Sequence, residues 1–284
     1  MLDFAAVRAA FSELTALTPL VQSGQRDVFR GQRANEEIVL KLVRVASPEV
    51  EARIGREIAA VAKLGCSYVP RIHDYGRRRV GQQDLSFIVE QYTPGETYRE
   101  CLRRQPVQPL SDVLRLADAL LNACCDFEAA GLVHRDIKPE NLIIGSAGQI
   151  WIIDFGIVRM LGLESITPTG RPAGSFTPGY GAPEQMRNLK PKIDARADLF
   201  SVGIVLYESL VGTNPYLAGA SDQLEVMRRV DGQDLRPLVI AGDPTGELSG
   251  FIAALVSRFP SRRPQTAGEA RQWFEELRPR LTPP

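Results

Sequence analysis

The chain has 284 residues, 44% of them hydrophobic, which is enough to bury a substantial core in one large domain or two packed lobes. Lysine and arginine number 34, as do aspartate and glutamate, so no net charge favours nucleic acid or an anionic membrane as a partner. The N-terminus lacks the layout of a secretory signal, and the four cysteines lack the spacing of metal ligands or of a disulfide framework. We expect a cytoplasmic protein with no nucleic-acid or membrane partner.

The first third of the chain predicts a small β-rich part that carries one helix. Short β-branched runs within residues 20–45 predict strands, and further strands are expected over Ile72–Arg79 and Asp84–Glu90. Between them, residues 49–64 place apolar side chains at helical spacing, namely Ile54, Ile58, Val61 and Leu64.

From Ser111 onward the pattern is helical. The segment from Ser111 to Gly131 begins with a residue that favours helix N-caps and ends with a glycine that favours helix C-termini. Further helices, separated by Gly, Pro and Asn, are expected over Ala195–Leu210, Ser221–Val230, Leu248–Arg258 and Ala267–Leu277. Strands followed by helices indicate an α+β fold with a small β-rich lobe and a larger helical lobe.

Several short motifs occur in a fixed order. The sequence reads VLK at residues 39–41, HRDIKPEN at 134–141, DFG at 154–156 and APE at 182–184. One tripeptide is a weak signal, but this order and spacing are specific. Together the motifs resemble the catalytic segments of protein kinases, and the resemblance extends over about residues 18–278.

The resemblance is to the Ser/Thr protein kinases, and more to bacterial members than to animal ones. It implies the bilobal kinase fold as one domain over residues 1–284, with an N-lobe in 1–91 that includes an N-terminal extension and a C-lobe in 92–284. It also implies transfer of the ATP γ-phosphoryl group to protein hydroxyls, the kinase itself included among candidate substrates. ATP and Mg²⁺ are the implied cofactors, with Mn²⁺ as an alternative metal.

The resemblance assigns the transfer step to particular side chains. Asp136 would orient the substrate hydroxyl and accept its proton, and Lys138 would stabilise the transferring phosphate. Lys41 would contact the α- and β-phosphates while paired with Glu57 on the expected helix.

The implied metal ligands are Asn141 and Asp154. Their side chains offer the hard oxygen donors that Mg²⁺ prefers over nitrogen or sulfur.

The implied adenine site is an apolar slot with few polar anchors. Val28 and Val39 would cover the base from one side and Ile143 from the other. The strand before the C-lobe is expected to present backbone groups to adenine at Glu90 and Tyr92, with Val89 as the gatekeeper.

The glycine-rich loop departs from the family pattern. Val21, Ser23 and Arg26 stand where the family has glycines, with Gly24 between them, and Ser23 and Gly24 are the expected phosphate contacts. Side chains at these positions reshape the approach of backbone N–H groups to phosphates. The alternative function is therefore a nucleotide-binding pseudokinase or scaffold with little activity. A small-molecule phosphotransferase would share the fold but normally lacks the APE segment.

The residues between DFG and APE resemble an activation segment. Thr177 matches the threonine that contacts the catalytic aspartate and lysine in Ser/Thr kinases, and Arg135 with Arg159 would form a cationic pocket for a phosphorylated loop. We expect regulation by activation-loop (auto)phosphorylation or by a partner protein. The candidate phosphorylation sites are Thr167, Thr169 and Ser175.

Five further residues match architectural positions of the family. Asp198 would anchor the backbone of the catalytic loop, and Arg263 would pair with Glu184 of the APE segment. His134 and Phe155 would belong to an internal hydrophobic column, so His134 is not expected to act as a general base.

Overall fold

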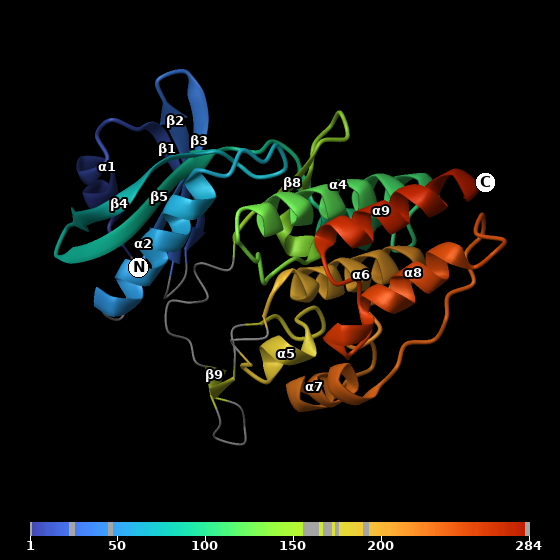
Figure 1. Cartoon of the computed structure of the whole chain (residues 1–284). Helices are drawn as coiled ribbons and strands as arrows, with labels where there is room; N and C mark the ends of the chain where they lie inside the picture. The colour runs from blue at the N-terminus through green and yellow to red at the C-terminus, as the bar shows by residue number, and fades with distance from the viewer. Residues whose placement is uncertain are drawn as a thin grey trace. The chain divides into compact units, whose positions relative to one another are not determined.

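The computed structural model describes residues 2–22, 26–44, 48–155, 165–166, 172–173, 176–189 and 193–281. Its described residues form two compact units, one from the chain up to Pro94 and one from the chain beginning at Gly95 (Figure 1). The expected lobe boundary at residues 91 and 92 lies just before this division. The α+β class is confirmed, because an antiparallel sheet with helices is followed by a mainly helical part.

The first unit is built on a five-stranded sheet in the order β1-β2-β3-β5-β4, with antiparallel neighbours throughout. Its strands are β1 (Thr15–Gln22), β2 (Arg26–Arg33), β3 (Glu36–Val43), β4 (Ile72–Val80) and β5 (Gln83–Gln91). The predicted helix is α2 (Pro48–Ala62), which contacts β4 and buries Ile54, Ile58 and Val61. The period-3.6 pattern thus identified the buried face of this helix.

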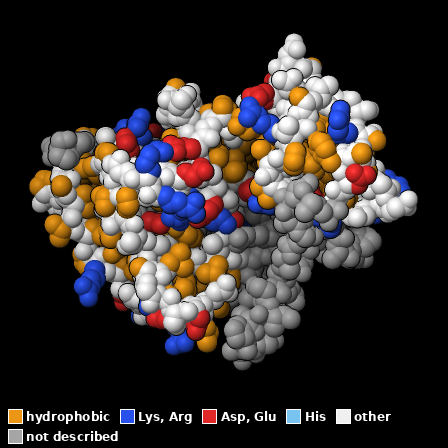
Figure 2. Space-filling model, turned by 180° about the vertical axis from the view of Figure 1, so that it is seen from behind, with side chains coloured by type: hydrophobic (Ala, Val, Ile, Leu, Met, Phe, Trp, Pro, Cys, Tyr) orange, Lys and Arg blue, Asp and Glu red, His pale blue; other side chains and the backbone are white. Residues whose placement is uncertain are grey.

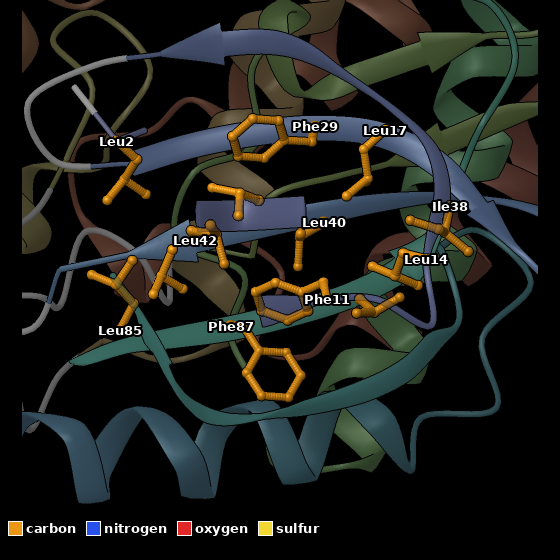
Figure 3. Close-up of a cluster of buried hydrophobic side chains, with 13 residues drawn as sticks. Leu2, Phe11, Leu14, Leu17, Phe29, Ile38, Leu40, Leu42, Leu85 and Phe87 are labelled. Carbon is orange, nitrogen blue, oxygen red and sulfur yellow. The ribbon is translucent and has the colours of Figure 1, made fainter. Parts of the chain in front are cut away.

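A short helix that the sequence did not lead us to expect, α1 (Phe4–Ala10), precedes the sheet. Asp3 caps it by accepting a hydrogen bond from the Ala5 N–H at 3.1 Å. Val7 and Phe11 are completely buried in a cluster with apolar side chains of β2, β3 and β5 (Figure 3). One face of the sheet is therefore covered by the N-terminal segment.

Arg78 of β4 fixes the end of this segment. Its guanidinium lies 4.4 Å from the ring centre of Phe11 and 4.9 Å from that of Phe87. It also donates to the Ala10 carbonyl at 3.0 Å and to Glu13 at 2.5 Å. The N-terminal segment is held by a cation as well as by apolar contact.

The second unit is mainly helical. Its helices are α3 (Tyr98–Arg104), α4 (Leu110–Ala129), α5 (Pro183–Met186), α6 (Ala195–Val211), α7 (Gln223–Gly232), α8 (Glu247–Leu255) and α9 (Ala267–Leu277), with 3₁₀ turns at Pro139–Asn141, Pro260–Arg262 and Arg278–Arg280. A small sheet contains β6 (Glu96–Thr97), β7 (Leu142–Ile144) and β8 (Ile150–Ile152), and β9 (Ser165–Ile166) pairs with β10 (Pro172–Ala173).

Helix α6 forms the centre of this unit. It contacts α4, α8 and α9, and its side chains are buried on all sides, as expected for a helix with no polar face. The Asp194 side chain caps its start, and Gly212 ends it with φ +85°. The predicted cap of α4 is wrong: the helix begins at Leu110 after Pro109, which makes no side-chain cap hydrogen bond, so Ser111 lies inside the first turn.

Charges are interspersed on the surface. On the face drawn in Figure 2, Lys and Arg side chains lie among Asp and Glu side chains. Within the described residues, no helix combines the length and apolar character needed to cross a membrane.

Candidate active site

The loop at residues 134–141 is anchored to α6 by one buried carboxylate. Asp198 accepts hydrogen bonds from the backbone N–H of His134 at 2.7 Å and of Arg135 at 2.8 Å. Burial raises the pKa of Asp198 to about 6, while the two N–H donors act in the opposite direction. Arg135 takes φ +69°, a strained backbone conformation for a non-glycine residue, and this double anchor holds it there.

Asp136 stands at the centre of a compact polar cluster. Its Oδ1 accepts from Thr177 Oγ1 at 2.5 Å, and its Oδ2 lies 3.0 Å from Lys138 Nζ. Lys138 Nζ also donates to Thr177 Oγ1 at 3.0 Å. The Asn141 amide donates to the Asp136 carbonyl at 2.8 Å and to its Oδ2 at 2.9 Å. The loop at residues 134–141 and the segment that carries Thr177 are thus joined at one carboxylate.

His134 is a packing residue in this geometry. It is completely buried, and its ring centre lies 4.6 Å from that of Phe155, which contacts Phe127 at 4.8 Å. Burial lowers the pKa of His134 to about 4, so the imidazole is neutral near pH 7. Its Nδ1 accepts the Asp136 N–H at 3.3 Å. The ring therefore supports the loop by accepting the Asp136 N–H and packing against Phe155. Its buried position suits packing rather than proton transfer.

Asn141 and Asp154 are brought together by the backbone. The N–H of Ile153, next to Asp154, donates to the Asn141 carbonyl at 2.8 Å. Because the Asn141 nitrogen faces Asp136, its Oδ1 is the atom left to act as a ligand. Asp154 adopts φ +56°. Two oxygen-bearing side chains on adjacent segments suit Mg²⁺, which completes its shell with water and phosphate oxygens. Among the described residues, no group of three or more His, Cys, Asp or Glu side chains could hold a metal.

A network that sequence reasoning missed supports the segment after Thr177. Arg99 of α3 lies 2.7 Å from carboxylate oxygens of both Glu140 and Glu208, and it also bonds the Tyr180 hydroxyl. That hydroxyl donates to Glu208. Although burial lowers the pKa of Arg99, its carboxylate partners raise it above the ordinary value. The only sequence signal was the position of Glu140 and Tyr180 within known motifs.

Two more contacts tie the APE segment to its surroundings. Arg263 donates to Glu184 from both terminal guanidinium nitrogens, at 2.6 and 3.1 Å. Gln185 donates to the Arg135 carbonyl at 2.9 Å, a contact that no sequence motif indicated. The backbone N–H and C=O of Arg135 are therefore both fixed by side chains of other elements.

In the first unit, Lys41 of β3 forms an ion pair with Glu90 of β5. Lys41 Nζ lies 2.5 Å from Glu90 Oε1, and the side chains are 8% and 13% exposed. The expected pair of Lys41 with Glu57 stays a prediction. Glu57 lies on α2 and is half-buried.

The strand register shows which of the expected adenine contacts lie on the same face of the sheet as Lys41. Val28 is opposite Lys41 and Val39 is opposite Glu90, so these four side chains share one face of the sheet. Val89 is opposite Leu40 and is buried in the cluster beneath α1, on the other face. The assignment of Val89 as gatekeeper was therefore wrong by one residue, because Glu90 holds the last position of β5 on the Lys41 face.

The backbone at the end of β5 also differs from expectation. The N–H of Tyr92 donates to the Glu37 carbonyl at 3.0 Å, which commits it to the sheet rather than to a purine. Glu90 is paired with Val39 on one side and with Ile72 on the other. Its backbone thus belongs to the interior of the ladder. In the second unit, Ile143 is buried in β7 opposite Trp151.

The other candidate residues lie outside the part of the chain that the structure describes. They are Ser23, Gly24, Arg159, Thr167, Thr169 and Ser175.

Comparison with known proteins matches residues 24–274 to the family model "Protein kinase domain". A probable serine/threonine-protein kinase, SCO3848 of Streptomyces coelicolor, is 30% identical over 89% of this chain and 38% of its own length. Serine/threonine-protein kinase PknB of Mycolicibacterium smegmatis is 31% identical, over 85% of this chain and 39% of its own length. Serine/threonine-protein kinase PknL of Mycobacterium tuberculosis is 32% identical, over 86% of this chain and 60% of its own length.

The chain thus spans between 38% and 60% of the length of these bacterial relatives. The family match covers strands β2 to β5, including Lys41, and the loop that carries Asp136. The chain belongs to the protein kinase domain family.

Proposed function

We propose that this chain is an active Ser/Thr protein kinase, which transfers the γ-phosphoryl group of ATP to a serine or threonine hydroxyl of a protein. The observation that carries the proposal is the cluster in which Thr177, Lys138 and Asn141 all contact the Asp136 carboxylate. A catalytic base must be oriented before substrate arrives, and this network fixes the carboxylate from three sides.

The cluster also suggests how the charges would be used. Asp136 would accept the proton of the attacking hydroxyl, while the Lys138 ammonium, 3.0 Å away, would offset the charge of the moving phosphoryl group. Thr177 links these two side chains and would hold their spacing constant. Asn141 and Asp154 would hold Mg²⁺, which when bound neutralises phosphate charge.

Residues of the five-stranded sheet would bind the nucleotide. Lys41 would bind the α- and β-phosphates, and Val28 and Val39 on the same face would contact the adenine ring. We propose ATP as the nucleotide, Mg²⁺ or Mn²⁺ as the metal, and the cytoplasm, where ATP is abundant, as the location.

Regulation through the activation segment is part of the proposal. Arg135 directly precedes the catalytic aspartate, so a phosphate bound to it would act on the cluster at short range. Phosphatase treatment should then lower activity, and alanine at Thr167, Thr169 or Ser175 should reproduce the loss. Full activity after complete dephosphorylation would contradict this regulation while leaving the kinase function intact.

The function itself is tested by incubating purified protein with γ-labelled ATP and Mg²⁺, alongside Asp154→Ala. The wild type should label itself or a generic protein acceptor, and the variant should not. Nucleotide binding without any label would favour the alternative of a nucleotide-binding scaffold, and label found only on small metabolites would indicate a different phosphotransferase.

A further inference from the structure

Lys41 has a carboxylate partner within its own sheet. Its Nζ lies 2.5 Å from Glu90 Oε1, and water reaches little of either side chain, since they are 8% and 13% exposed. Because water reaches so little of the pair, its two charges are stabilised mainly by protein partners, and this contact is one of them.

The register explains why the two side chains meet. Glu90 is opposite Val39, two residues before Lys41 on β3, and alternate residues of a strand share a face. Diagonal neighbours on one face of antiparallel strands are within reach of long side chains. Lys41 and Glu90 together provide the length that this diagonal contact requires.

The position of Glu90 is set by the sheet on both sides. Strand β5 lies between β3 and β4, and Glu90 itself is paired with Val39 and with Ile72. By contrast, Glu57 stands on helix α2, outside the strand ladder. The Lys41–Glu90 geometry therefore follows from strand pairing alone and does not require a particular placement of the helix.

We propose that Glu90 is a positioning residue for phosphoryl transfer: its carboxylate orients Lys41 and keeps the ammonium charged from within the sheet. This inference rests on the proposed kinase function. An isolated buried ammonium favours the neutral amine, and a carboxylate in contact favours the charged form that binds phosphate. Glu57 can add to this effect from α2, while Glu90 acts on Lys41 from within the sheet.

The first test measures the pairing without reference to activity. Urea midpoints are compared for wild type, Lys41→Met, Glu90→Met and the double variant, because a buried pair replaced as a whole is tolerated better than one broken on one side. We expect each single variant to unfold at lower urea and the double variant to recover part of the loss. Additive losses would overturn the proposal.

Two further double-mutant cycles, also measured by urea unfolding, show whether the coupling between Lys41 and Glu90 is specific. Lys41→Met with Glu57→Met tests the partner implied by family resemblance, and we expect weaker coupling there than with Glu90. Arg30→Met with Glu37→Met tests a pair at 2.5 Å on the same sheet whose side chains are 40% and 46% exposed. This exposed pair should show almost no coupling.

The second test asks whether the pairing serves the transfer step. Glu90→Gln should lower kcat about tenfold or more, because the oriented charge acts most strongly in the transition state. Its affinity for Mg·ADP, measured by calorimetry, should change much less. Glu90→Asp keeps the charge and should recover part of kcat, and Glu37→Gln should match wild type. Glu90→Gln with wild-type or higher kcat would overturn the positioning role.

The two tests separate the inference from the proposed function. A wild-type protein that transfers no phosphoryl group would defeat the kinase proposal, and with it the role of Glu90 in transfer. The double-mutant cycle on unfolding would still decide whether the Glu90 side chain interacts with Lys41.

Discussion

Arg263 and Glu184 form a two-pronged ion pair in the interior of the helical unit, with side-chain exposures of 0% and 3%. The guanidinium also donates to the carbonyls of Ser257 and Arg196 and lies 4.9 Å from the ring centre of Phe200. One arginine thereby joins the APE segment to the start of α6 and to the loop after α8.

Breaking this pair should destabilise the protein strongly. Glu184→Gln leaves a buried guanidinium without its counter-charge, and we expect a loss of about 3–5 kcal/mol in the free energy of unfolding. Urea titration measures it. The control is Glu275→Gln, whose pair with Arg271 is half-exposed, and which should change stability by less than about 0.5 kcal/mol. Equal losses in the free energy of unfolding at both sites would show that the buried pair stabilises the protein no more than an exposed pair does.

Removing the Thr177 hydroxyl should affect catalysis more than stability. Thr177→Val deletes the atom that donates to Asp136 and accepts from Lys138, and we expect kcat to fall about tenfold to a hundredfold. Thr177→Ser restores the hydroxyl and should restore most of the rate. If serine is as poor as valine at this position, the hydroxyl is not what links the two catalytic side chains.

Tyr180→Phe tests the network around Arg99. The variant removes a buried hydroxyl that bonds both Arg99 and Glu208, and we expect a loss of roughly 1–3 kcal/mol in stability. The KM for a protein acceptor should rise while the KM for ATP stays constant, because Tyr180 adjoins Thr177, whereas Lys41, Val28 and Val39 belong to the other unit. Tyr75→Phe, at an exposed tyrosine, is the control. A rise in both KM values would argue against a local effect on acceptor binding.

The buried His134 predicts a pH dependence of stability. Its pKa is lowered from 6.5 to about 4 in the folded protein, so between these pH values the unfolded chain binds a proton that the folded chain does not. Stability from this residue is therefore complete above pH 6.5 and falls as pH drops toward 4, by about 3 kcal/mol in total.

The comparison of wild type with His134→Phe isolates this effect, because the opposite contribution of Asp198 is present in both proteins. The difference in unfolding free energy should shift in favour of phenylalanine as pH falls from 7 to 4. A difference that is constant with pH would mean that the imidazole binds protons in the folded protein just as it does in the unfolded chain.

The candidate catalytic residues of the loop at 134–141 could be placed from sequence because their spacing in the chain is short. Asp136, Lys138 and Asn141 lie within six residues, and the loop backbone brings them together wherever the rest of the chain goes. Thr177 was more distant, and only the family resemblance linked it to Asp136. The contacts in the structure agree with that link.

The face of β5 could not be read from its sequence. Residues 85–89 are all buried, so the alternation that normally tells one face of a strand from the other is absent. For this reason Val89 was placed on the wrong face and Glu90 was considered only for its backbone. Phe4, Val7 and Phe11 behind Asp3 have the spacing of a capped amphipathic helix, but a segment of seven residues is too short for that pattern to decide the structure.

The most direct test of the account compares wild type with Asp136→Asn in a single-turnover assay with γ-labelled ATP, Mg²⁺ and a protein acceptor. Asparagine preserves the shape of the side chain but cannot accept the proton, so nucleotide binding measured by calorimetry should be retained while transfer falls by about a hundredfold or more. Transfer by the variant at the wild-type rate, with equal nucleotide affinity, would contradict the assignment of Asp136 as the catalytic base.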